Sequence, residues 1–312
     1  MRRHNLKRGM AGCLAAVLLL GGTACTANKA TAQTKPYVVG AVTKSADSEY
    51  WMSVCSGMEK AATDFGISVI ILSPESESDD KAQKKMIHDL IQKGVDALAV
   101  SPIQSYDTAY LQEAEEKQIP VVSYDTRIVK EKIPYVGIDN QKVGEELAKT
   151  MAQQMGNVGK VGIVSGDLNQ AAHKERVDGI RSYLKENTAI QIAFVESGYS
   201  NLLMSEKEIA RLMQVYADVD GIFVTSAVTA LGIMEYMRGT SVRIMTVDAQ
   251  QDTIEAVKNG DIAALAAQSG YDIGYAVIQY IAEHRGKEIM DSADKILDVE
   301  IVTAENIGTW KG

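Results

Sequence analysis

The sequence predicts an α/β protein in which two Rossmann-like lobes, each a doubly wound parallel sheet, are joined by a hinge. Short apolar runs recur along the chain, and amphipathic stretches of helical length separate them. Strands that alternate with helices form βαβ units, which produce parallel sheets covered on both faces. The chain has 312 residues, a length that suits two hydrophobic cores better than one. We therefore expect two sheets of about five or six strands each.

Most predicted strands are nearly continuous in apolar residues, as expected of strands buried on both faces. The strands are predicted at residues 37–42, 68–72, 97–100, 120–123, 135–138, 160–164, 190–195, 221–224, 242–247, 262–266 and 296–302. Two of the helices between them are predicted at residues 80–93, which Gly94 ends, and 143–155. The lobes are expected to be residues 36–139 with 269–297 at the N-terminal side, and 140–268 with 298–312 at the C-terminal side.

The first residues of the chain predict export. Residues 1–8 are basic, and the apolar run at 10–20 is too short to span a bilayer but has the length of a signal-peptide core. We expect residues 1–24 to be a signal peptide, so that the mature protein lies in the cell envelope outside the cytoplasm. Residues 25–35 are small and polar and are expected to form a flexible tether.

The sequence offers two alternative sites at which the signal peptide could be cleaved. Small residues lead to Cys25, an arrangement that resembles the bacterial lipoprotein signal, although Gly22 stands where that signal prefers Leu. This resemblance implies lipidation of Cys25 and anchoring of the protein to the membrane. The alternative is plain secretion with cleavage after Ala32, because residues 30–32 fit the A-x-A pattern.

Composition and motifs argue against several functions. The net charge is −9 although the first residues are basic, so the body of the protein is acidic and repels nucleic acid. Cys55 is expected to be a buried, inert thiol, and the acidic run at 75–80 a solvated loop. The histidines are scattered without metal-ligand spacing, and no nucleotide-binding or nucleophile motif is found. We therefore predict no catalytic residue, no metal and no cofactor.

Polar and aromatic side chains follow nearly every predicted strand. In parallel α/β sheets ligands lie beyond the carboxyl ends of the strands, so these residues are expected to gather in one site. Carboxylates and guanidinium groups bind hydroxyl groups, and aromatic rings cover the apolar faces of a sugar ring. The pattern therefore indicates a site for a small polyhydroxylated ligand.

Four segments in order give a family resemblance. Residues 44–57 (KSADSEYWMSVCSG), 92–102 (QKGVDALAVSP), 119–125 (IPVVSYD) and 222–225 (IFVT) resemble type I periplasmic binding proteins of the ribose- and galactose-binding group. The resemblance covers almost all of the chain after residue 36. It implies a solute-binding protein, expected to be a monomer, that closes around a sugar-like ligand and delivers it to the permease of an ABC importer.

Carried over position by position, the resemblance implies eleven ligand contacts. They are Lys44, Ser48, Tyr50, Trp51, Asp125, Thr126, Arg176, Tyr199, Ser226, Asp248 and Gln268. The sequence departs from the family at Thr126, where an Arg is frequent, at Ser226, where Asn or Asp is usual, and at Val247, where an aromatic residue is frequent. These departures leave the identity of the sugar open.

Structural roles are the alternatives at several of these positions. Tyr50 and Trp51 are adjacent, so one of them could belong to the core. Asp125 could cap a turn, Arg176 could pair with a neighbouring acid on its helix, and Asp248 could cap a helix at residues 250–259. At the level of function, the alternative to transport is a sensor that signals to a chemoreceptor or a membrane kinase. An enzyme would need an activated nucleophile or a metal, and a repressor would need an N-terminal DNA-binding motif; the sequence predicts neither.

Overall fold

The predicted fold class is confirmed. A computed structural model describes residues 35–46, 48–130 and 132–310, and this part of the chain contains two six-stranded sheets. The first sheet has the order β11-β5-β4-β3-β1-β2 and is parallel throughout. Its strands are β1 (Val38–Val42), β2 (Ser68–Leu72), β3 (Ala97–Val100), β4 (Val121–Tyr124), β5 (Tyr135–Ile138) and β11 (Lys295–Leu297).

The second sheet repeats this plan in the order β12-β10-β9-β8-β6-β7. Its strands are β6 (Val158–Ser165), β7 (Ala189–Ser197), β8 (Gly221–Val224), β9 (Arg243–Val247), β10 (Ala264–Ala267) and β12 (Glu300–Thr303). Strand β12 runs antiparallel to β10 at the edge of an otherwise parallel sheet. Each sheet therefore ends in a strand from the C-terminal part of the chain.

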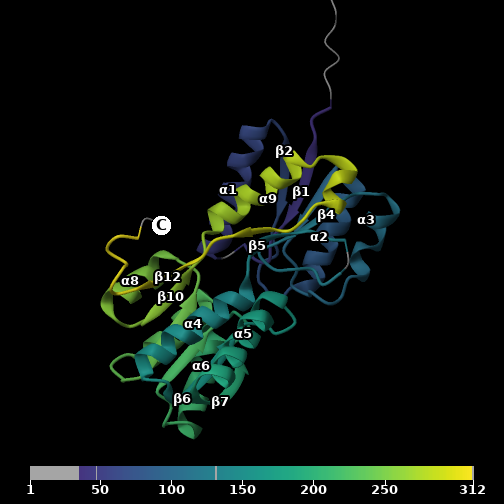
Figure 1. Ribbon diagram of the computed structural model, residues 1–312. Helices are drawn as coiled ribbons and strands as arrows, with labels where there is room; N and C mark the ends of the chain where they lie inside the picture. The colour runs from purple at the N-terminus through teal and green to yellow at the C-terminus, as the bar shows by residue number, and fades with distance from the viewer. Residues whose placement is uncertain (1–34, 47, 131, 311–312) are drawn as a thin grey trace, which may run out of the picture. The chain divides into compact units, whose positions relative to one another are not determined.

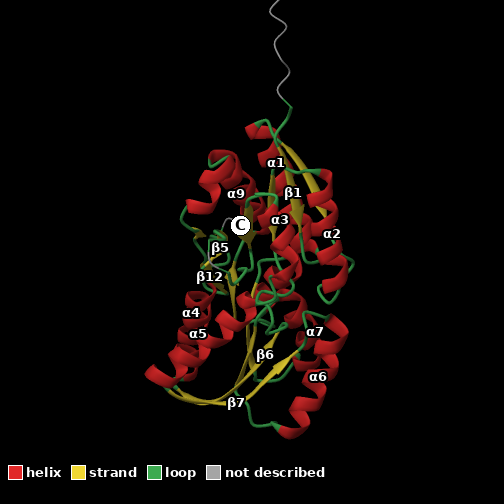
Figure 2. Cartoon of the chain, turned by 90° about the vertical axis from the view of Figure 1, so that its right-hand side faces the viewer, coloured by secondary structure: helices red, strands yellow, loops and turns green. Residues whose placement is uncertain are grey.

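Helices cover both faces of each sheet (Figures 1 and 2). In the first lobe, α1 and α9 pack together on one face, and α2 with the short α3 covers the other. In the second lobe, α4 and α5 cover one face, and α6, α7 and α8 cover the other. The helices are α1 (Glu49–Phe65), α2 (Asp80–Lys93), η1 (Ala109–Leu111), α3 (Gln112–Glu116), α4 (Asn140–Met155), α5 (Ala171–Asn187), α6 (Leu202–Val215), α7 (Ala227–Met237), α8 (Gln251–Asn259), α9 (Gly270–Glu283) and η2 (Gly286–Asp291).

One predicted strand is wrong. The apolar run at 296–302 was expected to form a single strand, but it forms β11 in the first sheet and β12 in the second. The apolar pattern indicates that both segments are partly buried. It does not indicate that β11 and β12 belong to different sheets. The chain crosses from one sheet to the other three times: after β5, after β10, and between β11 and β12. In the described part of the chain, these three crossings connect the two lobes. The exact lobe boundaries stay a prediction.

The predicted signal peptide, Cys25 and nearly all of the predicted tether lie outside the described residues. Within residues 35–46, 48–130 and 132–310, no helix combines the length and apolar character that a membrane span requires.

Candidate functional site

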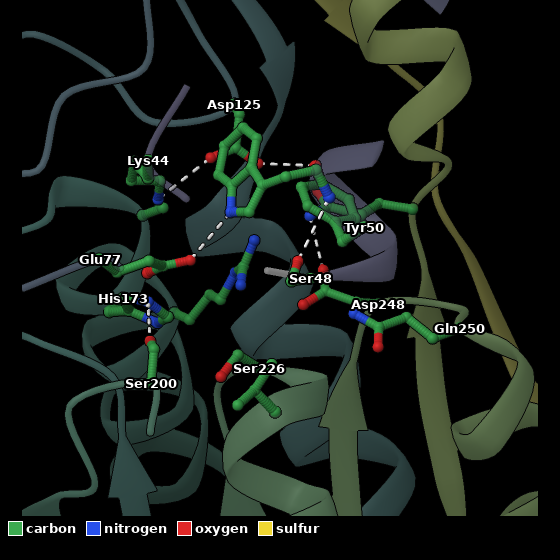
Figure 3. Close-up of a pocket in the computed structure, with 15 residues that line it drawn as sticks. Lys44, Ser48, Tyr50, Glu77, Asp125, His173, Ser200, Ser226, Asp248 and Gln250 are labelled. Carbon is green, nitrogen blue, oxygen red and sulfur yellow. Dashed lines mark hydrogen bonds and ion pairs between the residues drawn. The ribbon is translucent and has the colours of Figure 1, made fainter. Parts of the chain in front are cut away.

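Strand ends from both lobes meet in one pocket (Figure 3). Every residue of the predicted site except Thr126 and Tyr199 lines this pocket. Figure 3 shows Lys44, Tyr50 and Asp125 from the first lobe on one side, and Ser226 and Asp248 from the second lobe on the other. The lining residues are Lys44, Ser48, Tyr50, Trp51, Glu77, Asp125, Ala172, His173, Arg176, Ser200, Ser226, Val228, Asp248, Gln250 and Gln268.

Asp125 is the buried acid of the first lobe. It follows β4 with a left-handed backbone (φ 59°), a conformation that Asp tolerates better than most residues. Its carboxylate lies 3.2 Å from Lys44 Nζ and accepts hydrogen bonds from Tyr50 Oη (2.6 Å) and Ser101 Oγ (3.1 Å). Burial disfavours the charged form, but the ammonium of Lys44 and the hydroxyl of Tyr50 outweigh burial, so the pKa of Asp125 lies below its ordinary value. Asp125 is therefore ionised and paired, and it is not a turn cap alone.

Lys44 links this acid to the second lobe. Its ammonium donates to Thr126 Oγ1 (2.8 Å) and to Gln170 Oε1 (2.7 Å), and Gln170 belongs to the N-terminal end of α5. Thr126 is fully buried and holds Lys44 and Asp125 instead of lining the pocket. The structure therefore gives Thr126 a supporting position behind the two charged groups.

Arg176 provides the buried cation of the second lobe. Its helix α5 approaches α4 closely, because a Cβ on Gly144 would lie 2.2 Å from the carbonyl oxygen of Arg176. Its guanidinium donates to Asn140 Oδ1 (2.9 Å) and to the carbonyl oxygen of Thr225 (2.7 Å). The alternative in which Arg176 pairs with a neighbouring acid on the helix surface is wrong for Asp178, because that carboxylate pairs with a lysine and Arg176 is buried.

A second glycine explains the spacing of the R-x-x-G pattern. A Cβ on Gly179 would lie 2.1 Å from the carbonyl oxygen of Gln141, so only glycine permits this contact between α5 and α4. Gly179 lies about one helical turn after Arg176 on α5. The close contact of Gly179 with α4 therefore holds α5 in place next to the position from which Arg176 reaches the pocket. The R-x-x-G pattern therefore has a packing reason that is independent of any ligand contact by Arg176.

Asp248 is the buried acid of the second lobe. It follows β9 with φ 75°, and it accepts hydrogen bonds from Gln268 Nε2 (2.6 Å) and from the amide of Ala227 (3.3 Å). Burial raises its pKa above the ordinary value, and the charge of Arg176 opposes this only in part. Asp248 does not cap α8, because Gln250 occupies that position. Gln268 Oε1 finds no hydrogen-bond partner among the described residues.

The aromatic pair Tyr50 and Trp51 is buried and lines the pocket with both rings. The two rings meet edge to face at 5.2 Å, and Trp51 Nε1 donates to Glu77 Oε1 at 3.0 Å. The alternative in which one of the two belongs to the core alone is therefore wrong, because both are buried and both line the pocket. Ser48, which accepts from the amide of Trp51 at 3.3 Å, begins the helix that carries them.

Six lining residues were missed by the sequence analysis: Glu77, Ala172, His173, Ser200, Val228 and Gln250. Glu77 belongs to the acidic segment expected to be a solvated loop, yet its carboxylate reaches both Trp51 and Gln170. His173 is buried and hydrogen-bonded to Thr225 Oγ1 at 2.8 Å. Burial and the nearby charge of Arg176 lower the pKa of His173 well below its ordinary value, so its imidazole is neutral. The position of His173 three residues before Arg176 on one helix was the available signal.

Three further positions named in the sequence analysis are Tyr199, Ser226 and Val247. Tyr199 is 50% exposed and lies outside the lining, where Ser200 is found instead. Ser226 begins α7 and donates to Thr229 Oγ1 at 3.0 Å. Val247 is fully buried in the core of the second lobe and therefore does not face the pocket.

The chemistry of the site suits binding. Cys55 lies outside this pocket and is half-buried, less than expected, and burial raises the pKa of its thiol, which disfavours the reactive thiolate. In the part of the chain that the structure describes, no group of three or more His, Cys, Asp or Glu residues is arranged to hold a metal ion. What the pocket offers is a ring of donors, acceptors and aromatic surface.

Comparisons with known proteins agree with this geometry. Residues 39–288 match the family described as the periplasmic binding protein domain. The chain is similar to the ribose import binding protein RbsB of Bacillus subtilis (strain 168), with 27% identity over 245 residues, which are 77% of this chain and 79% of the relative. It is also similar to the D-allose-binding periplasmic protein of Escherichia coli (strain K12), with 24% identity over 281 residues, which are 84% of this chain and 90% of the relative.

Solved structures show the same architecture. An ABC transporter solute binding protein from Agrobacterium vitis with bound D-fucose superimposes with a TM-score of 0.80 at 25% sequence identity. The match covers 86% of this chain and 96% of that protein.

Proposed function

Because the chain belongs to the family of periplasmic binding proteins, we propose that it captures a sugar or sugar-like molecule between its lobes and delivers it to an ABC importer. One observation carries the proposal: a single pocket combines an ion-paired acid, an aromatic pair, an arginine and a second acid from two lobes. These groups match the hydroxyl rim and the apolar faces of a small polyhydroxylated ring.

The polar groups of the second lobe support hydroxyl recognition. Gln268 Oε1 is buried and without a partner among the described residues, so a ligand hydroxyl that donates to it would satisfy it. Asp248 can accept from a second hydroxyl, since its carboxylate is held by an amide side chain and a backbone amide instead of a cation. A ligand without these hydroxyls would leave Gln268 Oε1 unpaired and would not use the remaining acceptor capacity of Asp248, and this makes the site selective.

Closure is the proposed working motion. Contacts already join the lobes on either side of the pocket: Lys44 donates to Gln170, the amide of Ala171 donates to Ser105 Oγ (2.8 Å), and the amide of Gln251 donates to Glu49 (3.3 Å). A ligand that contacts both lobes stabilises the arrangement in which they meet, and binding shifts the population toward it. Periplasmic binding proteins close around ligands by hinge motion.

The cellular setting follows the same reasoning. We infer export by the predicted signal peptide, anchoring through a lipid on Cys25, and action as a monomer that presents its bound sugar to a membrane permease. Transport is favoured over sensing, because the relative from Bacillus subtilis is named for import and the one from Agrobacterium vitis for an ABC transporter. A role in binding is likewise favoured over an enzymatic one, since the relatives are binding proteins.

Thermal unfolding with a panel of solutes tests the proposal. Pentoses, hexoses, polyols and nucleosides are added one at a time, with amino acids as control solutes. A true ligand at a hundred-fold excess over its Kd stabilises the protein by about 2.7 kcal/mol. If no member of the sugar panel raises the melting temperature above the amino-acid controls, sugar capture is wrong.

A further inference from the structure

A second cavity opens directly from the ligand pocket. The two cavities share five lining residues, namely Ser48, Glu77, Ser200, Val228 and Gln250. We call the ligand pocket the inner pocket and the second cavity the outer chamber, which has a volume of about 390 Å³. This volume falls within the roughly 300–1,000 Å³ that small-molecule sites occupy. A ligand held in the inner pocket therefore has a large space beside it.

One wall of the outer chamber is apolar. Leu202 and Leu203 begin α6, and Val228 and Leu231 belong to α7. The two helices touch closely here, because a Cβ on Gly232 would lie 2.4 Å from the carbonyl oxygen of Leu202. Leu202 and Leu203 are 46% and 63% exposed, so much of their apolar surface is open to solvent. This wall offers apolar area that a ligand group can cover.

The opposite wall is polar and acidic. The first lobe contributes three serines and the carboxylates of Glu49 and Glu77, and the second lobe adds the carboxylate of Asp252. Among the residues described as lining the chamber, none is basic. A phosphate or carboxylate placed here would be repelled, whereas an uncharged group with one apolar face fits.

We propose that the natural ligand is a glycoside: its sugar ring occupies the inner pocket, and its uncharged, largely apolar substituent lies in the outer chamber against Leu203 and Leu231. This inference rests on the proposed function and names the class of sugar. A free monosaccharide fills only the inner pocket, so the leucine wall stays in water and contributes nothing to its affinity.

Isothermal titration calorimetry on the purified protein tests the proposal. The probes are D-ribose, D-xylose, D-glucose and D-galactose, each as the free sugar, the methyl glycoside, the phenyl glycoside and the 1-phosphate, in both anomers. For the sugar that binds, the phenyl glycoside is expected to bind at least about tenfold more tightly than the methyl glycoside, because its ring covers apolar surface. The 1-phosphate is expected to bind more weakly than the methyl glycoside.

Two variants and a matched control locate the effect. Leu203→Ser and Leu231→Ala are expected to remove most of the phenyl advantage while leaving the affinity for the methyl glycoside unchanged. Val215→Ser is the control, because Val215 is 65% exposed on the same helix α6 and lies outside the chamber.

Three results overturn the inference. Phenyl and methyl glycosides of equal affinity would contradict it, as would an equal effect of Leu203→Ser and Val215→Ser; in both cases sugar capture itself stands. If neither the free sugars nor any glycoside binds, the proposed function fails together with it.

Discussion

The two lobes place an aspartate at matching positions, yet the two aspartates differ in charge environment. Asp125 follows β4 and Asp248 follows β9, and both have a left-handed backbone. The amide of each donates to the neighbouring strand, Asp125 to Val136 at 3.0 Å and Asp248 to Ala266 at 3.1 Å. The matching topology of the lobes thus brings two acids to one pocket.

Their partners make the difference. Asp125 is paired with Lys44, and its pKa is lowered, whereas Asp248 is held by Gln268 and a backbone amide, and its pKa is raised. A buried acid that forms an ion pair is satisfied before any ligand arrives, while one held only by neutral donors keeps acceptor capacity for a ligand. In the proposed function, the first lobe is therefore a preformed half-site, and the second lobe keeps acceptors for the hydroxyl groups of a ligand.

The largest expected effect follows from removing the paired acid. Asp125→Ala leaves the buried Lys44 ammonium without its counter-ion, and this is expected to lower the free energy of unfolding by about 3–5 kcal/mol. Asp248→Asn keeps the shape and removes no ion pair, so a loss of about 1 kcal/mol is expected. Urea unfolding of the two variants measures both, and equal losses would remove the distinction between the lobes.

Arg176 acts on both acids and is expected to dominate ligand affinity. Its charge favours the ionised form of Asp125 and of Asp248. Arg176→Met is expected to weaken binding of the sugar found by thermal screening by about a hundredfold, as for loss of a charged hydrogen-bond donor. Arg181→Met, an exposed arginine on the same helix, is the matched control. Similar affinities of the two variants would mean that Arg176 only supports the fold.

The pH dependence of stability is expected to have opposite signs for the two acids. The ordinary pKa of both is 3.8. The pKa of Asp125 is lowered in the folded state, so its contribution is present above pH 3.8 and is lost as pH falls through the folded pKa. The pKa of Asp248 is raised, so the folded state binds the proton more tightly, and stability falls as pH rises from 3.8 through the folded pKa.

Unfolding of wild type, Asp125→Asn and Asp248→Asn across pH 2–7 separates these contributions. Relative to wild type, Asp248→Asn should become more stable as pH rises above 3.8, and Asp125→Asn should become less stable as pH rises toward 3.8. Parallel curves for the two variants would show that the acids share one environment.

The smallest expected effect concerns the aromatic side of the first lobe. Glu77→Gln keeps an acceptor for Trp51 Nε1 but removes charge, so ligand affinity should change by less than about fivefold.

Trp51 fluorescence should still respond to the ligand in a Trp310→Phe background, which leaves Trp51 as the one tryptophan of the chain. A signal that disappears in that background would place the change at Trp310 and not in the pocket.

The sequence predicted the strands and the strand-end residues well for a physical reason. Strands such as 68–72 and 135–138 are short apolar runs bounded by turns, so their positions depend on local pattern. Asp125 and Asp248 directly follow such strands, and the carboxyl ends of parallel strands converge on one site. The segment at 296–302 was wrong because two different sheets cover its two halves, a fact that no local pattern contains.

The sequence by itself thus determined the fold class, the family resemblance and most of the polar groups around the pocket. Only the tertiary structure decided which partners those groups have. Lys44 meets Asp125 across 81 positions of the chain, and Glu77 meets Gln170 across 93. Charge state depends on burial and on neighbours within a few ångströms, and folding, not sequence order, sets both. For this reason the two aspartates look alike in the sequence and behave differently in the folded protein.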